Sequence, residues 1–450
     1  MEVIVKIGQF LLSLSILVVL HELGHFAFAK LFRARVEKFY MFFDAGFSLF
    51  KFKKGDTEYG IGWLPLGGYV KISGMIDESM DKEQMKLPPE PHEFRSKPAY
   101  QRLLIMVGGV MVNFILAFVI YIAVLYTWGE QYLPAENVRY GVVCDSLAES
   151  IGLQDGDKII ALDNQKVERF SQIVPDILLN DPQSIQFLRN NKQLSVDIPS
   201  TFIADLLARS SKGFSLSPVL DIRYPYSAIS IGKVAKDSPA KIAGLLEGDK
   251  IVSIDSIRFE YYDQFQDFSA ANKGKSVVAI IDRAGKEVVL NLTIGEDGKY
   301  GFYPAMEAGV FEYATLKYTF AESIPAGFNK GIDKLGSYLK QFKLIFSSET
   351  KAYKSIGGFG TIASIFPGVW NWQAFWNLTA FLSIILAIMN ILPIPALDGG
   401  HVMFLMYEII TGRKPGDKFM EYAQITGMVL LFGLLIFANG NDLWKWISNM

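Results

Sequence analysis

Cysteine and histidine are scarce in this sequence. Its 450 residues include one cysteine, Cys144, and four histidines. A single cysteine cannot form an internal disulfide, and a chain without a Cys-x-x-Cys pair has neither a zinc ribbon nor a dithiol redox site. Any metal bound here must therefore be held by histidine and carboxylate side chains. The histidines are His21, His25, His92 and His401.

Excess charge of either sign is also lacking. The 44 basic and 46 acidic residues leave a net charge of -2, which gives no electrostatic reason to expect a nucleic-acid partner. Apolar residues, by contrast, are abundant. They make up 50% of the chain, and the mean hydropathy is +0.24, which is high for a soluble enzyme of this length. We expect a membrane protein with substantial soluble parts.

Four apolar segments are long enough to cross a bilayer, or nearly so. They are Ile7–Phe28, Leu103–Trp128, Trp372–Leu392 and, approximately, Ala423–Ala438. The first follows a single positive charge, Lys6, and has no small-x-small cleavage site. It is therefore predicted to be a retained span and not a signal peptide.

Basic residues form three clusters next to these spans: one after the first span, one before the second, and one between the third and the fourth. The clusters are Lys30, Arg33, Arg35 and Lys38; Arg95, Lys97 and Arg102; and Arg413, Lys414 and Lys418. Because basic loops stay in the cytoplasm, this pattern predicts a cytoplasmic location for residues 31–101 and 396–422. Residues 129–371 are then outside, and the chosen orientation also puts the N-terminus outside.

The first span contains an unusual polar motif, VVLHELGHFAFAK. His21 and His25 are four residues apart, so on a helix they share one face, with Glu22 beside them. This His-Glu-x-x-His pattern can supply two imidazole ligands for zinc and a carboxylate that takes a proton from water. A charged group facing lipid at this depth costs about 2.5–3.5 kcal/mol, which argues against an idle glutamate. The alternative is a polar patch that only packs against other helices.

A third ligand is needed, because catalytic zinc usually has three protein ligands and one open position. The end of the third span, NILPIPALDGG, offers Asp398. Pro393 and Pro395 break the helix, and the two glycines after Asp398 permit a tight turn back toward the membrane interior. His401 is the competing ligand, and His92 ranks lower. Asp398 could alternatively be only a helix cap.

The segment between the first two spans reads as short strands. The sequence FYMFFDAGFSLFKFKKGDTEYGIGWLPLGGYVKISGM is broken at Gly55-Asp56 and at residues 65–68. Its apolar content predicts a sheet that dips into the membrane or lies against it near the motif, with an ordinary cytoplasmic hairpin as the alternative. The charged, proline-containing stretch 77–98 is expected to be irregular.

The outer region contains an internal repeat. DSLAESIGLQDGDKIIALDNQKV, from Asp145, aligns without a gap with DSPAKIAGLLEGDKIVSIDSIRF, from Asp237. Each copy reads as a short helix, a Gly-Asp turn and an alternating strand. The pair resembles tandem PDZ domains of the circularly permuted bacterial kind over about residues 135–310. Such domains bind a peptide as an added strand, although they could also serve only as packing modules.

Together these motifs resemble the site-2 protease family, in its bacterial RseP-like branch, over nearly the whole chain. The resemblance rests on HELGH, on NILPIPALDGG, on the tandem repeat, and on GGVMVNF in the second span. It implies an intramembrane zinc metalloprotease with Zn²⁺ held by His21, His25 and Asp398 and with Glu22 as general base. It further implies substrate binding by a set of six residues: Asn390, Pro393, Pro395, Asn113, Gly67 and Gly68.

The resemblance also implies partners and location. The substrates would be single-span membrane proteins already cut outside by a site-1 protease, such as an anti-sigma factor, and also remnant signal peptides. The enzyme would sit among the lipids of the bacterial inner membrane with its PDZ domains in the periplasm. Two departures from the family pattern concern substrate clamping: FYMFFDAGFSLF lacks Gly-x-Gly, and Phe359 stands where Gly-Pro is frequent.

The predicted fold is thus a polytopic α-helical membrane protein with a membrane-associated β-rich cytoplasmic loop and two extracytoplasmic α+β PDZ domains. The predicted segments are 1–30 (first span), 31–101 (β loop and proline-rich stretch), 102–128 (second span), 129–225 and 226–312 (PDZ domains), 313–371 (amphipathic helices), 372–398 (third span), 399–422 (connection) and 423–450 (fourth span and tail).

Two other functional classes remain open at this point. A catalytically inactive membrane scaffold could use the PDZ pair for binding, but it would tolerate the loss of Glu22. A metal transporter could also place histidines and acids in a membrane, yet its polar residues would be spread along a path. Here they cluster at one depth.

Overall fold

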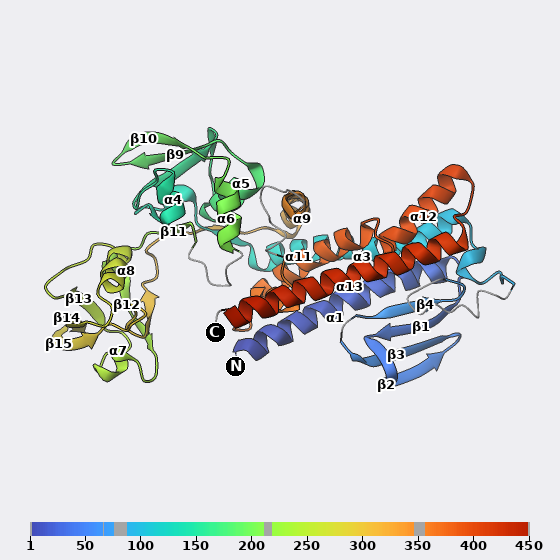
Figure 1. Cartoon of the computed structure of the whole chain (residues 1–450), viewed down its shortest axis with the longest axis horizontal. Helices are drawn as coiled ribbons and strands as arrows, with labels where there is room; N and C mark the ends of the chain where they lie inside the picture. Colours follow the sequence, from blue (N-terminus) through green and yellow to red (C-terminus); the bar gives the residue numbers. More distant parts are fainter. Residues whose placement is uncertain (1, 66, 76–87, 211–217, 346–355, 449–450) are drawn as a thin grey trace. The chain divides into compact units, whose positions relative to one another are not determined.

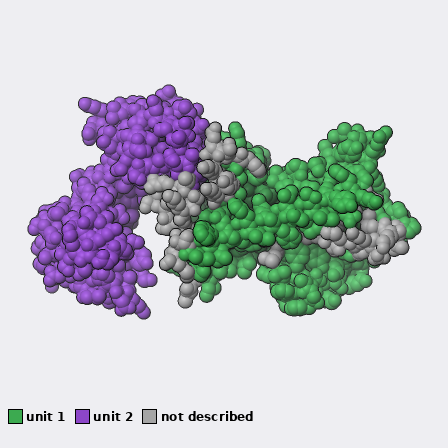
Figure 2. Space-filling model, viewed as in Figure 1, with its two compact units in different colours: residues 1–129, 317–346, 353–450 green, residues 130–316, 347–352 purple. Residues whose placement is uncertain are grey.

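The computed structural model describes residues 2–65, 67–75, 88–210, 218–345 and 356–448. The chain forms two compact units, which Figure 2 shows in green and purple. Unit 1 contains residues 1–129, 317–346 and 353–450, and unit 2 contains residues 130–316 and 347–352. Unit 1 therefore gathers segments from both ends of the sequence.

Four helices of unit 1 have the length and composition of membrane spans. They are α1 (Glu2–Leu31), α3 (Ala99–Trp128), α11 (Trp372–Ile391) and α13 (Asp417–Ser448) (Figure 1). Each helix contains one of the predicted apolar segments almost entirely. The bounds differ most at α13, which extends beyond the predicted segment at both ends. A helix satisfies its backbone hydrogen bonds internally, as a span in lipid requires. The architecture is that of a polytopic membrane protein.

Helix α3 packs against both α1 and α11. Buried hydrogen bonds join the three helices: Ser383 on α11 donates to the carbonyl oxygen of Asn113 on α3 at 2.7 Å, and Thr379 on α11 donates to Ser13 on α1 at 2.9 Å. Hydrogen bonds between spans satisfy groups that would otherwise be unpaired in lipid. The core of unit 1 is thus built on three helices that hold polar as well as apolar side chains.

Four strands occupy the region in which short strands are expected. They are β1 (Val36–Met41), β2 (Phe43–Lys54), β3 (Thr57–Leu64) and β4 (Tyr69–Ile72), in the order β2-β3-β1-β4. β1 is parallel to β3, and the other pairs are antiparallel. Val36 and Ile72 share a buried cluster with Ala29 of α1 and Ile105 of α3, which anchors the sheet at the end of α1.

The remaining parts of unit 1 are helices. α9 (Phe320–Ile345) packs along α3, and α10 (Phe359–Ile365) contacts α1. α12 (Asp398–Thr411) fills most of the predicted connection 399–422. Of the stretch 77–98, residues 77–87 lie outside the described part, and the rest includes a short 3-10 helix, Phe94–Ser96.

Unit 2 contains two large hydrophobic cores, one within residues 135–220 and one within residues 226–300, and a smaller buried cluster of Leu133, Val138 and Phe311. The first core is surrounded by β6 (Val142–Cys144), α4 (Ser146–Ser150), β7 (Lys158–Leu162), β8 (Gln165–Lys166), α5 (Ile173–Asn180), β9 (Ser184–Arg189), β10 (Lys192–Asp197), α6 (Phe202–Ser210) and β11 (Leu220–Ile222). The second is surrounded by β12 (Ile229–Val234), α7 (Pro239–Ile242), β13 (Lys250–Ile254), α8 (Tyr262–Ala271), β14 (Ser276–Arg283), β15 (Lys286–Thr293) and β16 (Phe302–Met306). The entering strand β5 (Glu130–Tyr132) pairs with the leaving strand β17 (Ala314–Leu316).

The repeated sequences have the same local structure and the same ion pair, in which the aspartate is buried and the arginine is partly exposed. In the first copy, Arg189 donates to both carboxylate oxygens of Asp157, at 2.8 and 2.7 Å, and to the carbonyl oxygen of Gly152. In the second, Arg283 makes the equivalent bonds to Asp249, at 2.8 and 2.7 Å, and to Gly244. Such bidentate pairs are strong and geometrically specific, so the Asp of each Gly-Asp turn fixes the turn to a neighbouring strand.

Candidate metal centre

Two histidines of α1 and one aspartate of α12 meet inside unit 1. His21 and His25 are buried one turn apart, and Asp398 is partly buried. Asp398 Oδ2 lies 3.1 Å from His21 Nε2 and 3.3 Å from His25 Nε2, and the two Nε2 atoms are 3.2 Å apart. The structure therefore brings together the three residues that the sequence suggests as metal ligands.

The hydrogen-bond partner of His25 indicates that this cluster fits a cation. His25 Nδ1 lies 2.9 Å from the carbonyl oxygen of Ile105. A carbonyl oxygen only accepts, so in a neutral ring Nδ1 carries the hydrogen and Nε2 keeps its lone pair. That lone pair and the Asp398 carboxylate oxygen are both electron-rich and repel each other. A cation bound between them turns this repulsion into attraction. Two imidazole nitrogens and one carboxylate oxygen are a ligand set that suits zinc.

Asp398 reaches the histidines because the chain breaks between α11 and α12. α11 ends at Ile391, and α12 begins at Asp398 itself. Between them, proline at 393 and 395 prevents regular helix, and Ala396 has a φ of 83°. Gly399 is required by close approach, because a Cβ atom there would overlap the carbonyl oxygen of Leu392. The prolines and the glycine thus act together to turn Asp398 inward.

A cavity of about 800 Å³ opens beside these three candidate ligands. Glu22 lines it, next to His21 on α1, and so do Asn390, Gly67 and Gly68. Asn390 Nδ2 lies 3.3 Å from His21 Nε2. Gly68 allows the chain before β4 to approach α1, because a Cβ atom there would lie 2.9 Å from a methyl carbon of Val18.

Pro393 and Pro395, which were also predicted to bind substrate, have a different position from these residues. Pro393 and Pro395 are not among the described residues that line the cavity, and both lie in the break between α11 and α12. The carbonyl group of Pro395 lies so close to Gly427 of α13 that a Cβ atom on Gly427 would overlap it. The prolines therefore shape the chain that carries Asp398.

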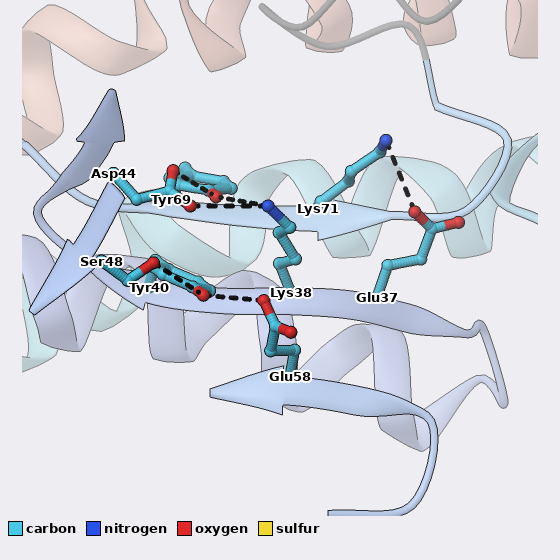
Figure 3. A network of polar contacts seen from close by, with 8 residues as sticks. All are labelled: Glu37, Lys38, Tyr40, Asp44, Ser48, Glu58, Tyr69 and Lys71. Carbon is cyan, nitrogen blue, oxygen red and sulfur yellow. Dashed lines mark hydrogen bonds and ion pairs between the residues drawn. The ribbon is translucent and has the colours of Figure 1, made fainter. Parts of the chain in front are cut away.

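The sheet forms one wall of the cavity through a polar network (Figure 3). Tyr69 of β4 donates to Asp44 at 2.8 Å, and Lys38 Nζ lies 3.5 Å from the same carboxylate and 3.4 Å from the Tyr69 hydroxyl. The Tyr69 ring stacks on Tyr40, with centroids 5.4 Å apart. Burial and the bond to Asp44 raise the pKa of Tyr69 above its usual value, so the hydroxyl remains a donor at neutral pH.

The other two histidines are not among the described residues whose ligand atoms converge. His401, the competing ligand, lines the same cavity. His92 is half-exposed, and its Nδ1 lies 3.2 Å from Glu90. Of these two histidines, His401 lines the cavity, and His92 is not among the described residues that line it.

Besides Ile105, two more residues of α3 contact the histidines, and this role was not predicted from the sequence. Asn113, predicted to bind substrate, is buried with its Nδ2 atom 3.1 Å from His21 Nδ1, and it is not among the residues lining the cavity. Gly109 lies against both rings, and a Cβ atom there would be 2.6 Å from His21 Cε1. Their spacing of four residues puts both on one face of α3. The sequence contains that signal, but it does not say which helix lies opposite.

Comparison with known proteins assigns the family. The model of peptidase family M50 matches residues 9–434, nearly the whole chain. The chain belongs to peptidase family M50. Its similarity to individual members of the family also extends from end to end.

Among the relatives is the "Regulator of sigma E protease" of Haemophilus influenzae, which is 27% identical over 97% of this chain and 98% of the relative. A "Putative zinc metalloprotease" of Borreliella burgdorferi is 29% identical over 96% of each chain, and one of Neisseria meningitidis is 27% identical over 97% of this chain and 98% of the relative. The family and these relatives identify the chain as a zinc-dependent metallopeptidase of the site-2 protease type. The resemblance inferred from the sequence is confirmed at this level.

Proposed function

We propose that His21, His25 and Asp398 hold the zinc ion and that Glu22 is the general base for hydrolysis of a peptide bond within a membrane span. The observation that carries this proposal is the convergence of two Nε2 atoms and one carboxylate oxygen beside a cavity lined by Glu22. A zinc ion held there supplies a Lewis acid that polarises the scissile carbonyl and lowers the pKa of the attacking water.

Glu22 moves the proton during the reaction. Its carboxylate takes a proton from the attacking water and returns it to the leaving amide nitrogen as the peptide bond breaks. Glu22 directly follows the proposed ligand His21 on α1. It also lines the cavity, so a substrate bound there can reach its carboxylate.

The substrate must be locally unwound, because a helical peptide bond is shielded by its own hydrogen bonds. β4 is an edge strand, and its residues Tyr69 to Ile72 all line the cavity. An unwound segment can pair with such an edge as an added strand. Asn390, Gly67 and Gly68, which line the cavity, are proposed to contact its backbone, and Pro393 and Pro395 are proposed to act by shaping the chain that carries Asp398.

The two repeats of unit 2 are proposed to be PDZ domains outside the cytoplasm, in the periplasm of a bacterium with the enzyme in its inner membrane. This orientation follows from the basic clusters at the ends of the spans. The pair would exclude proteins that still carry a bulky outer domain. One relative is named for the regulation of sigma E, which supports a single-span anti-sigma factor, already cut outside, as the substrate class.

The ligand assignment is tested with the purified full-length protein. Wild type, His25→Ala and Asp398→Asn are compared for zinc content and for cleavage of a single-span substrate that lacks its outer domain. Of these three proteins, only the wild type is expected to contain stoichiometric zinc and to cleave the substrate. His92→Ala is the matched control, and it should retain both. Loss of zinc in His401→Ala together with its retention in Asp398→Asn would reassign the third ligand.

A further inference from the structure

Asn113 of α3 is completely buried, and one of its polar atoms has no partner. The Nδ2 atom lies 3.1 Å from His21 Nδ1, whereas Oδ1 makes no hydrogen bond within the described part of the chain. An unsatisfied buried oxygen costs about 1–3 kcal/mol, so an arrangement that satisfies it is favoured.

The two atoms that face each other are both donors. Gly109, one turn before Asn113 on α3, also lies against the His21 ring. With Nε2 as the proposed metal-binding atom, its lone pair is taken up by the metal, and the hydrogen of a neutral His21 ring belongs on Nδ1. Nδ1–H then meets the NH₂ group of Asn113, donor against donor.

Rotating the Asn113 amide by half a turn removes both faults. The oxygen and nitrogen of an amide are nearly identical in shape, so their assignment is decided by the hydrogen bonds that each makes. After the rotation Oδ1 accepts from His21 Nδ1–H, so this buried oxygen gains a donor.

We propose that Asn113 is a positioning residue, whose side-chain oxygen accepts the hydrogen of His21 Nδ1 and thereby leaves Nε2 free for the metal. This inference rests on the proposed zinc ligands. His25 is fixed in the same way by the carbonyl oxygen of Ile105, at 2.9 Å. Helix α3 thus sets the tautomer of both histidine ligands, one through a side chain and one through its backbone.

The assignment removes Asn113 from the substrate-binding set. Partners that orient a metal-ligating histidine typically change metal affinity 10- to 100-fold when they are lost. We expect a change of about tenfold here.

The test compares two replacements of nearly the same size. Asn113→Asp keeps the accepting oxygen and removes the donor, whereas Asn113→Leu removes both. Zinc retention by the purified full-length protein is measured against a series of free-zinc buffers, together with elution as a folded species. Ser383→Ala is the control, since it removes a buried hydrogen bond to the Asn113 backbone without touching His21.

We expect Asn113→Asp and Ser383→Ala to bind zinc as the wild type does and Asn113→Leu to bind it about tenfold more weakly. Equal loss in the Asp and Leu variants would overturn the acceptor role, and so would unchanged affinity in Asn113→Leu. If Asn113→Leu does not fold, the Asp variant alone decides, because only an acceptor role predicts that it retains zinc. Absence of zinc from the wild type would instead contradict the proposed ligands.

Discussion

Gly24 of α1 lies directly against Gly108 of α3. A Cβ atom on Gly24 would overlap the carbonyl oxygen of Gly108, and a Cβ atom on Gly108 would lie 2.8 Å from the carbonyl oxygen of Gly24. Gly24 immediately precedes the ligand His25. The backbones of the two helices therefore meet at the level of the metal centre, and glycine at both positions permits the contact.

Gly24→Ala is expected to separate the two helices and weaken the fold. Forcing extra volume into a packed contact typically costs about 1–3 kcal/mol, more than the helix gains from losing a glycine. Thermal unfolding in detergent and zinc content measure the effect. Gly8→Ala, on the same helix but with open space around it, is the control and should be neutral or stabilising. Identical behaviour of the two variants would refute the contact.

Gly109→Ala is expected to affect the metal more than the fold. The added methyl group overlaps His25 Nε2 and approaches His21, so both rings must move. Alanine also favours the helix, so α3 itself should persist. We expect zinc affinity to fall at least tenfold. Zinc titration of Gly109→Ala beside Gly433→Ala, which has open space around it, checks this, and equal affinities would contradict it.

The second repeat of unit 2 should lose stability in acid. Burial disfavours the charged form of Asp249, but the hydrogen bonds from Arg283 and from the Leu246 amide outweigh it and hold the pKa of Asp249 below its usual value. The unfolded chain therefore binds this proton more tightly. The stabilisation is complete above the unfolded pKa, about 4, and is lost as the pH falls through the folded pKa.

Hydrogen exchange of β13 in the full-length protein, measured at a series of acidic pH values, tests this effect. Asp249→Asn should be less stable near neutral pH and should show a weaker dependence on pH. An unchanged slope in the variant would mean that another group is responsible.

Removal of residues 130–316 of unit 2 should preserve peptide hydrolysis and widen the range of substrates that are cleaved. β5 and β17 pair with each other, so the chain enters and leaves unit 2 at neighbouring points and Gly129 can be joined to Lys317 by a short linker. We expect the shortened protein to retain zinc. It should also cleave a single-span substrate that still carries its outer domain, which the full chain spares. Equal selectivity of the two proteins would argue against the proposed filter.

The features that could be predicted from the sequence are those with a strong signal in residue periodicity or motif spacing. Four apolar segments predict the four candidate spans, and the His-Glu-x-x-His spacing brings His21 and His25 to one face. Asp398 could be selected because two prolines and two glycines around it interrupt an apolar run. These signals are local, so no knowledge of the packing is needed to read them.

Packing between helices could not be predicted in the same way. Asn113 was grouped with substrate-binding residues, and only the position of α3 against α1 brings its amide to His21. The bond from Tyr69 to Asp44 likewise depends on the register and order of four strands. Helix α12 begins at Asp398, before the two glycines, because the turn lies within residues 392–397.

The central claim is that Glu22 moves the proton and does not hold the metal. Cleavage and zinc content of Glu22→Gln, measured in the same preparation as the wild type, test it most directly. Glutamine has the same size and cannot take the proton, so we predict unchanged zinc and a fall in cleavage of about 10²- to 10⁴-fold. Full cleavage by a zinc-loaded Glu22→Gln protein would contradict the account.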